Sequence, residues 1–345
     1  MGAFRGMLAV TAAGALLLGP FVVRGHCEST EAPQNNVILF GWDGAQREHV
    51  KECLGRGELP ALQSIAAQGS IVEIDALRVT DTKAGWSQIL TGCNPETSGI
   101  FSNGRYGPIP AGMTIFERLE DYFGKDNITT VAVIGKKGHV DADGPKKFRE
   151  TARTIRRRSL LRQRRAEGKV VVEEGIRYRE IPAKPYFNAK DNMDLFINGL
   201  GENQAVGEKA IELLEQCRDS PFFFFVHFAD VDHKGHKFGE NSAEYNEALI
   251  SCDRWTGEIV KKVREMGLEG KTTFYVTADH GFDEDTKGHA DAPYVFLASS
   301  DPAIIRRGER ADIAATILEK LGIPPAEGWP LDGHTLTRPY EAPKW

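Results

Sequence analysis

The 345-residue sequence lacks several features that would identify a protein class at once. It has only five cysteines, and no two of them have the Cys-x-x-Cys spacing of a structural zinc site. Its formal net charge of −6 is mild and gives no general argument for nucleic-acid or membrane binding. No internal repeat or low-complexity segment is present. What remains is a globular composition, with 41% hydrophobic and 27% charged residues.

The longest apolar run lies at the N-terminus. Residues 8–23 follow Arg5 and are interrupted by Pro20, so the run is too short and too broken for a membrane span. It predicts a cleaved signal peptide over residues 1–26 and a linker over 27–35. Lipid anchoring at Cys27 and an uncleaved anchor are the alternatives. We therefore expect an exported protein, periplasmic or extracellular, whose only membrane tether would be this N-terminus.

Beyond the signal peptide, buried strands alternate with segments of helical period. This alternation predicts an α/β fold with a doubly wound, mostly parallel sheet over residues 36–340. The expected strands cover residues 36–41, 71–79, 129–136, 222–228, 272–277 and 293–299. The expected helices cover residues 47–54, 60–68, 82–92, 114–123, 203–216, 242–266 and 312–321. Export would permit disulfides, but the spacing names no pairing among the four remaining cysteines, Cys53, Cys93, Cys217 and Cys252.

The pattern weakens between residues 136 and 200, which predicts an insertion or cap on the core domain. Within it, residues 146–169 are strongly basic. This stretch could bind an anionic polymer, anionic lipid head groups or an acidic substrate. A solvated face of the cap is the interpretation that the charge pattern favours.

Two buried strands end in carboxylate and imidazole side chains. The run FFFFVHF stops in a polar turn that holds Asp232 and His236, and the run TTFYVT ends at Asp279 and His280. Runs of this kind are typical of strands that are buried on both faces. Because ligands collect outside the carboxyl ends of parallel strands, we expect a metal site at this edge of the sheet.

Asp43, Thr82 and His289 are further candidates for the same site. Taken singly, such residues have ordinary interpretations: a turn or helix cap for Asp43, a helix N-cap for Thr82, and a solvated side chain for His289. Taken together, mixed imidazole and carboxylate ligands suit zinc and similar ions. Three carboxylates leave two divalent cations under-neutralised, which suits a phosphate dianion. Two metals roughly 4 Å apart can hold the attacking and leaving oxygens of an in-line displacement.

With these residues in place, the sequence resembles the alkaline phosphatase superfamily, on its type I phosphodiesterase/nucleotide pyrophosphatase and sulfatase-like side. The resemblance covers about Asn36 to Leu336. It rests on GWDG at 41–44, LTGCNPETSGI at 90–100, D-x-x-G-H at 232–236, ADHG at 278–281 and GHADAPYVFLAS at 288–299. Residues 312–324 and 331–336 resemble the C-terminal signature of that superfamily. The resemblance implies an alkaline phosphatase-like catalytic domain.

The resemblance also implies roles for the candidate residues. Counting back from Gly92 by the spacing of the family identifies Thr82 as the nucleophile, which would form a phospho-threonine intermediate. Two divalent metal ions would be bound, with zinc as the expected metal and manganese as an alternative. One would be held by Asp232, His236 and His289, and the other by Asp43, Asp279, His280 and the Thr82 oxygen.

Substrate contacts are suggested by weaker matches. Asn103 resembles the asparagine that contacts a phosphoryl oxygen, and Lys136 and His139 resemble a sulfatase-branch segment, although an exposed basic turn is an equal interpretation for these two. Lys83 replaces the aromatic residue that commonly follows the nucleophile in the nucleotide-cleaving branch. Lys83 could attract an anionic leaving group or merely face solvent. The Cys-x-Pro-x-Arg signature of classical sulfatases is absent.

The sequence therefore predicts an exported two-metal hydrolase that cleaves phosphomonoesters or phosphodiesters through a threonine nucleophile. The expected partner is a small-molecule phosphate ester, and no nucleic-acid partner is predicted. A sulfatase-like or phosphotransferase member of the same superfamily is one alternative, and a catalytically inactive metal-binding module is another. His227 and His233 flank the metal motif and either support the site or serve packing alone.

Overall fold

The structure is a computed structural model of the chain. It describes residues 31–76, 79–138, 146–149, 169–181, 193–292, 294–324 and 329–340. The predicted signal peptide, most of the basic stretch 146–169 and the candidate His139 lie outside these ranges. Within the described residues, no helix has both the length and the apolar character needed to cross a membrane.

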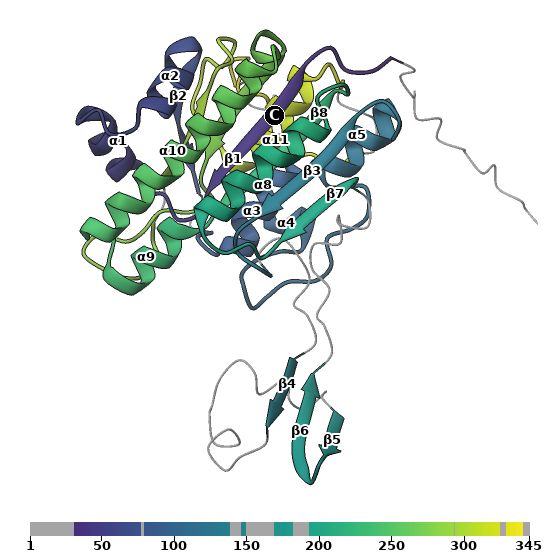
Figure 1. Cartoon of the computed structure of the whole chain (residues 1–345), viewed down its shortest axis with the longest axis vertical. Coiled ribbons are helices and arrows are strands. Elements are labelled where there is room, and N and C mark those ends of the chain that lie inside the picture. Colours follow the sequence, from purple (N-terminus) through teal and green to yellow (C-terminus); the bar gives the residue numbers. More distant parts are fainter. Residues whose placement is uncertain are drawn as a thin grey trace, which may run out of the picture.

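An eight-stranded sheet forms the centre of the main body (Figure 1). Five neighbouring strands run parallel, and β10 runs antiparallel to both of its neighbours. The predicted mostly parallel sheet is thus confirmed. In spatial order the strands are β11 (Gly308–Glu309), β2 (Ser70–Asp75), β10 (Tyr294–Ser299), β9 (Thr272–Thr277), β1 (Asn36–Trp42), β8 (Phe222–Phe228), β3 (Thr129–Ile134) and β7 (Leu195–Asn198).

Helices cover both faces of this sheet, as a doubly wound fold requires. On one face α10 (Ala243–Glu265) contacts α1, α2, α8 and α9, and on the other α11 (Arg310–Lys320) contacts α3 and α5 (Figure 1). A 3₁₀ turn, η2 (Glu269–Lys271), precedes β9. The remaining helices are α1 (Arg47–Gly55), α2 (Pro60–Gln68), α3 (Thr82–Thr91), α4 (Pro95–Ser98), α5 (Ile115–Phe123), α8 (Asn203–Gln216) and α9 (Asp230–Phe238).

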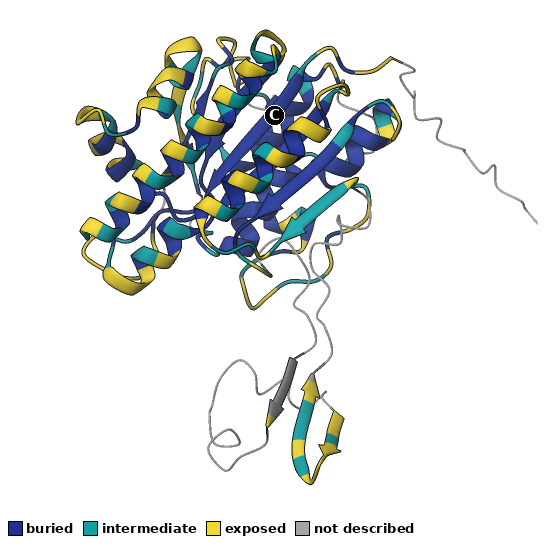
Figure 2. Cartoon of the chain, viewed as in Figure 1, coloured by how far each residue is buried: buried dark blue, intermediate teal, exposed yellow. Residues whose placement is uncertain are grey.

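The central strand β8 explains why its sequence is apolar throughout. It pairs in parallel with β1 on one side and β3 on the other, and each of its seven residues is buried (Figure 2). A strand covered by helices on both faces has no solvated side, so it reads as a continuous apolar run. The register sets Gly41 of β1 opposite His227 of β8.

The segment after β8 corrects one expectation. The predicted polar turn is the nine-residue helix α9. Asp230 and Asp232 stand in its first turn and His236 in its last, charges that suit the helix dipole. Gly235 allows the Phe282 ring to pack on this helix, because a Cβ there would lie 2.5 Å from Phe282 Cζ. The helix places Asp232 and His236, four residues apart, on one face.

A second sheet lies apart from the main body in Figure 1. It is antiparallel, in the order β4 (Lys146–Arg149), β6 (Ile176–Ile181), β5 (Lys169–Glu173). All three strands fall within the predicted insertion at 136–200. Strand β7 falls within the same range, yet it pairs with β3 in the central sheet. Strand β7 is therefore part of the central sheet, although the predicted insertion includes its residues.

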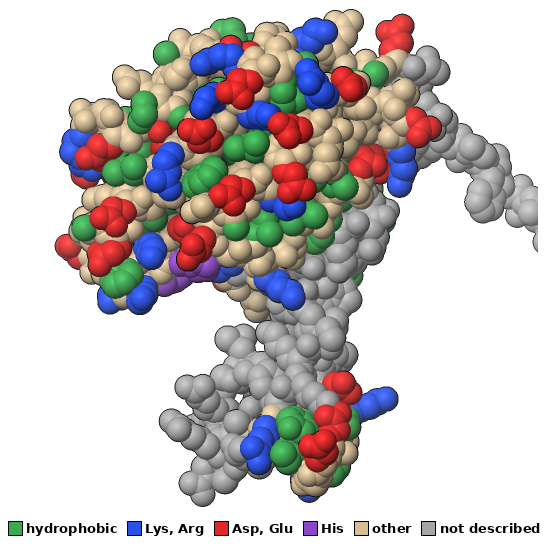
Figure 3. All heavy atoms as spheres, in the orientation of Figure 1, with side chains coloured by type: hydrophobic (Ala, Val, Ile, Leu, Met, Phe, Trp, Pro, Cys, Tyr) green, Lys and Arg blue, Asp and Glu red, His purple; other side chains and the backbone are tan. Residues whose placement is uncertain are grey.

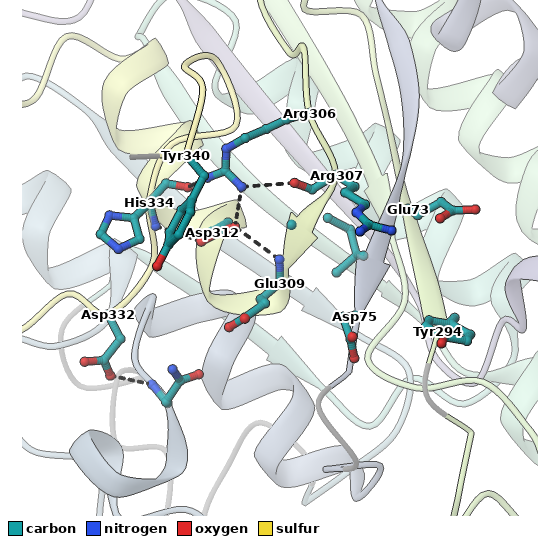
Figure 4. A pocket seen from close by; sticks show the side chains of 13 residues that line it. Glu73, Asp75, Tyr294, Arg306, Arg307, Glu309, Asp312, Asp332, His334 and Tyr340 are labelled. Carbon is teal, nitrogen blue, oxygen red and sulfur yellow. Dashed lines mark hydrogen bonds and ion pairs between the residues drawn. The ribbon is translucent and has the colours of Figure 1, made fainter. Parts of the chain in front are cut away.

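The C-terminal segment packs back along α11 and lines a pocket of about 730 Å³ (Figure 4). Arg306 forms an ion pair with Asp312 at 3.0 Å and donates to the backbone carbonyl of His334 at 2.7 Å. Asp332 accepts a hydrogen bond from the backbone N–H of Asn94 at 2.7 Å. These contacts hold α11 against α3, the helix that begins at Thr82.

The four described cysteines, Cys53, Cys93, Cys217 and Cys252, are all buried free thiols. None of the disulfides that export would permit is therefore present among them. Burial raises the pKa of the Cys53 thiol to about 11, so that thiol stays protonated at neutral pH.

Candidate active site

The six acidic and imidazole side chains predicted as metal ligands meet at the carboxyl ends of three strands. Asp43 follows β1, α9 follows β8, and Asp279 and His280 follow β9. His289 comes from the loop that leads into β10. They form two groups, in each of which the ligand atoms lie within 4.8 Å of one another: Asp43, Asp279 and His280 in one, and Asp232, His236 and His289 in the other.

His280 joins the two groups to Thr82. Its ring is completely buried, and its Nε2 atom lies 3.2 Å from Thr82 Oγ1. The same atom lies 3.5 Å from a carboxylate oxygen of both Asp43 and Asp279 and 3.7 Å from Asp232 Oδ1. The hydroxyl of Thr82 is therefore close to the whole carboxylate–imidazole cluster.

Backbone carbonyls fix the tautomers of two histidines. His280 Nδ1 lies 2.9 Å from the Gly281 carbonyl oxygen, and His236 Nδ1 lies 2.8 Å from that of Lys287. A carbonyl oxygen can only accept, so each Nδ1 carries the proton. Both Nε2 lone pairs are left for the site, which is the form that ligates metals. The Thr82 hydroxyl consequently donates to His280 Nε2.

His289 belongs to the group that contains Asp232 and His236, and its ring stacks on the ring of His280. The two rings stack with centroids 3.9 Å apart, and the His236 ring lies 5.1 Å from that of His289. Burial and the neighbouring His280 lower the pKa of His289 to about 4. His289 is therefore neutral at pH 7, as a ligating imidazole must be.

The carboxylates make the site strongly attractive to cations. Burial raises the pKa of Asp279 well above its ordinary value, and the charges of Asp43 and Asp232 raise it further. Burial also acts to raise the pKa of Asp232, but His236, His280 and Lys136 together outweigh it and hold that pKa at about 2. Like charges crowded in this way are stable only with a counter-charge.

Two carboxylate oxygens in the cluster test whether the residues fit metal ions. Asp232 Oδ1 and Asp279 Oδ2 are buried and accept no hydrogen bond from the residues that the structure describes. Buried polar atoms without partners are rare and call for an explanation. Each atom belongs to a group that also offers imidazole nitrogen, the donor combination that zinc and similar ions prefer. The residues therefore fit two divalent cations.

Two glycines allow the elements of the site to approach one another. Gly44, with φ of +78°, follows Asp43, and a Cβ on it would lie 3.0 Å from the Cα of Asp232. Gly85 lies in α3 three residues after Thr82, and a Cβ on it would lie 2.7 Å from the Asp279 carbonyl oxygen. The nucleophile candidate thus reaches the cluster because α3 packs directly on the backbone of Asp279.

Asn103 forms hydrogen bonds with the residues directly before and directly after Thr82. Its backbone N–H donates to Asp81 Oδ1 at 2.9 Å, and its side-chain Oδ1 accepts from the backbone N–H of Lys83 at 2.9 Å. Since Oδ1 faces a donor, the amide NH₂ of Asn103 remains as the group that can donate. Lys136 forms an ion pair with Asp232, so its ammonium lies in the cluster and is not part of an exposed turn.

Two other expectations can be compared with the structure. Lys83 is only 4% exposed, so the solvent-facing alternative for this residue is wrong. His227 Nε2 lies 3.0 Å from Asp43 Oδ2, and both side chains are buried, whereas His233 is exposed. Of the two flanking histidines, only His227 therefore supports the site.

Arg310 is the contributor that sequence reasoning missed. It is buried at the start of α11 and donates to the backbone carbonyls of Asp279, Ala76 and Val79. It thereby fixes the backbone on which Asp279 and His280 stand. The sequence around Arg310 carries no signal for this role, because its acceptors are main-chain atoms from distant segments.

The model of the type I phosphodiesterase/nucleotide pyrophosphatase family matches residues 37–299. The chain belongs to this family. The match covers every one of the predicted metal ligands, from Asp43 to His289, together with Thr82.

Relatives of this phosphodiesterase-family chain include enzymes of transfer and of hydrolysis. It is 23% identical over 281 residues to GPI ethanolamine phosphate transferase 1 of Aspergillus oryzae, covering 76% of this chain and 24% of that protein. It is 22% identical over 266 residues to the bis(5′-adenosyl)-triphosphatase enpp4 of Mus musculus, covering 76% of this chain and 50% of that protein. The chain thus spans between a quarter and a half of the length of these relatives.

Solved structures share the fold of this phosphodiesterase-family chain. The lipoteichoic acid synthase LtaP of Listeria monocytogenes aligns with a TM-score of 0.55 at 15% identity, covering 89% of this chain and 76% of that one. An alkaline phosphatase superfamily protein of Vibrio parahaemolyticus aligns with a TM-score of 0.55 at 16% identity, covering 90% and 71%. The predicted alkaline phosphatase-like fold is therefore confirmed.

Proposed function

We propose that this family member is a metal-dependent enzyme that cleaves phosphate esters, with Thr82 as nucleophile. The single observation that supports this most strongly is the position of the Thr82 hydroxyl, 3.2 Å from His280 Nε2 at the junction of two carboxylate–imidazole groups. A hydroxyl at a helix N-terminus ionises more easily, because the helix dipole favours negative charge there, and the ionised hydroxyl can attack phosphorus.

The ligand assignment follows the two groups. Asp232, His236 and His289 would hold one divalent cation, and Asp43, Asp279 and His280 with the Thr82 oxygen would hold the other. Zinc fits this donor set, and manganese is an alternative. When bound, the cations supply positive charge that favours the ionised hydroxyl and neutralises the phosphoryl oxygens.

The protein's own groups then account for the course of the reaction. The Thr82 hydroxyl gives its proton to solvent, and its oxygen forms a bond to phosphorus while the bond from phosphorus to the leaving oxygen breaks. The leaving oxygen takes up a proton from solvent. The product on the enzyme is phospho-threonine. The amide NH₂ of Asn103 and the ammonium of Lys136 would donate to phosphoryl oxygens as negative charge develops there. Hydrolysis of the phospho-threonine by water regenerates Thr82.

Transfer to an alcohol is a second candidate outcome of the same first step. Its support is the similarity over 76% of the chain to a GPI ethanolamine phosphate transferase. An alcohol would replace water and receive the phosphoryl group from Thr82. The two outcomes share one site and differ only in the acceptor, so products formed with and without an added alcohol separate them.

We further propose that the substrate is a small phosphate ester and that the protein is exported through a cleaved N-terminal signal peptide. The export proposal depends on the apolar run at residues 8–23. Protease protection in intact cells, with the first 26 residues deleted as a control, tests it. Protein that remains inside cells with those residues intact would contradict it.

The test of the nucleophile compares Thr82→Ala with Thr82→Ser on aryl phosphate monoesters and diesters. We expect Thr82→Ala to keep its bound metal and to lose turnover by about 10³-fold or more, while Thr82→Ser, which retains a hydroxyl, keeps measurable turnover. Metal analysis of the same samples excludes loss of the site as the cause. Full turnover by Thr82→Ala would reject Thr82 as nucleophile.

A further inference from the structure

Lys83 directly follows the nucleophile candidate and is buried, with 4% of its surface exposed. Its ammonium donates to the backbone carbonyl of Gly138 and lies 5.2 Å from the centroid of the Tyr106 ring. A buried ammonium is costly unless hydrogen bonds or an aromatic face compensate it. The chain provides both at this position, so the side chain is built into the structure.

The contacts of Lys83 tie three separate segments together. Lys83 stands in the first turn of α3, and Tyr106 lies three residues after Asn103 in the loop between α4 and α5. Gly138 lies in the loop after β3 that carries Lys136. The backbone N–H of Lys83 holds the amide of Asn103, while its side chain reaches the loop of Lys136. Both proposed substrate contacts are thus fastened to the residue next to Thr82.

We propose that Lys83 is a positioning residue, which holds Lys136 and Asn103 in register with Thr82 through the Gly138 carbonyl and the Tyr106 ring. This inference rests on the proposed function, since it concerns the same site. It assigns Lys83 no contact with substrate. It replaces the interpretation in which the Lys83 charge attracts an anionic leaving group.

The physical reason is the precision that the reaction requires. A catalytic group displaced by about 1 Å can lose about 100-fold in rate. The loop at 135–138 begins at Gly135, whose backbone is fixed by hydrogen bonds with His227 and Gly201. Beyond Gly135 the loop is held at Asp232, through Lys136, and at Lys83, through Gly138. Without the Lys83 ammonium the Gly138 carbonyl loses this partner, and the end of the loop can move relative to Thr82.

The experiment is a double-mutant cycle between Lys83→Met and Lys136→Met, measured as kcat/KM on an aryl phosphate diester. Methionine keeps the apolar stem and removes the donor. Lys137→Met is the matched control, because Lys137 lies in the same loop and is exposed. Thr82→Ala is assayed beside these variants, with metal content and Tm determined for each.

If Lys83 acts through Lys136, we expect kcat/KM to fall by about 10- to 100-fold in each single variant. The kcat/KM of the double variant should then be less than about threefold below that of the less active single variant. Lys83→Arg should recover most of the rate, because a guanidinium can donate to the same carbonyl. Metal content and Tm should match those of the wild type, and Lys137→Met should retain full activity.

Three results would overturn the inference. Effects of the two single variants that multiply would indicate a direct and independent contact of Lys83 with the substrate. Loss of metal or a large fall in Tm in Lys83→Met would indicate a purely structural role. Full activity of Lys83→Met beside an inactive Thr82→Ala would reject this inference alone, whereas an active Thr82→Ala would reject the proposed function itself.

Discussion

Replacing Gly85 by alanine tests whether α3 must contact Asp279, because this contact reverses the sign of the stability change that alanine normally causes in a helix. In a helix interior, replacing glycine by alanine normally stabilises a protein by about 0.5–1 kcal/mol. At Gly85 the added Cβ would lie 2.7 Å from the Asp279 carbonyl oxygen and 2.8 Å from the Asp279 Cβ. It would also lie 2.9 Å from Arg310 Nη1, which itself holds that carbonyl.

The magnitude follows from these distances. Ordinary contacts between nonbonded heavy atoms begin near 3.5 Å, so α3 must retreat by roughly half an ångström or more. Overpacking of this kind costs about 1–3 kcal/mol. For a chain of 345 residues that corresponds to a fall in Tm of about 1–4 °C. Because Thr82 moves with α3, we expect kcat to fall by about 10- to 100-fold.

Gly55→Ala is the matched control. Gly55 ends α1 and is exposed, and a Cβ on it would meet nothing within 4 Å. We expect this variant to be as stable as the wild type or slightly more stable, with unchanged activity. The assay is Tm by calorimetry with kcat on an aryl phosphate. A Gly85→Ala protein that is stabilised like Gly55→Ala and fully active would refute the claim that α3 must touch Asp279.

Two further predictions concern buried groups outside the ligand set. His227→Ala should weaken zinc affinity by about 10- to 100-fold, because it removes the imidazole that orients Asp43. His227→Gln keeps an N–H donor and should lose less affinity. A competitive chelator titration measures the affinities, and equal affinity in the wild type and both variants would contradict the prediction. Burial raises the pKa of Asp253 to about 6, despite hydrogen bonds from the backbone N–H groups of Leu62 and Ala61. Since the folded protein then holds the proton more tightly than the unfolded chain, Asp253 contributes stability below about pH 4 that is lost as pH rises through about 6. The free energy of unfolding of metal-free wild type minus that of Asp253→Asn should therefore fall by up to about 3 kcal/mol between pH 4 and 6, as followed by urea denaturation, and a flat difference would show the pKa to be unshifted.

The sequence predicts those parts of the fold in which a local pattern of residues is compatible with a single structural environment. The run of four phenylalanines in β8 can be accommodated only where helices cover both faces, so it marks the sheet centre. Asp279 and His280 follow a buried strand directly, and their placement at the sheet edge follows from that alone. The long amphipathic segment that forms α10 was predicted within one or two residues of its bounds.

Other features depend on contacts that no local pattern encodes. The segment DVDHKGHKF has too few apolar residues to reveal a helical period, and its helix is completed by the packing of Phe282 on Gly235. The apolar run of β10 does not indicate the direction of the strand, which is set by its antiparallel pairing with β9. The role of His227 arises only because parallel pairing brings β8 beside the end of β1. The burial of Lys83 needs two loops from elsewhere in the chain.

The antiparallel course of β10 has a consequence for how the two cation positions would exchange with solvent. Because β10 starts at the edge where β9 ends, the loop between them crosses over the cluster and delivers His289, while α9 delivers His236, whose side chain is 45% exposed. The ligands Asp43, Asp279 and His280 are wholly enclosed. Local opening of the loop that carries His289 would therefore expose the position held by Asp232, His236 and His289 and leave the other position enclosed. A cation at the exposed position should be lost first.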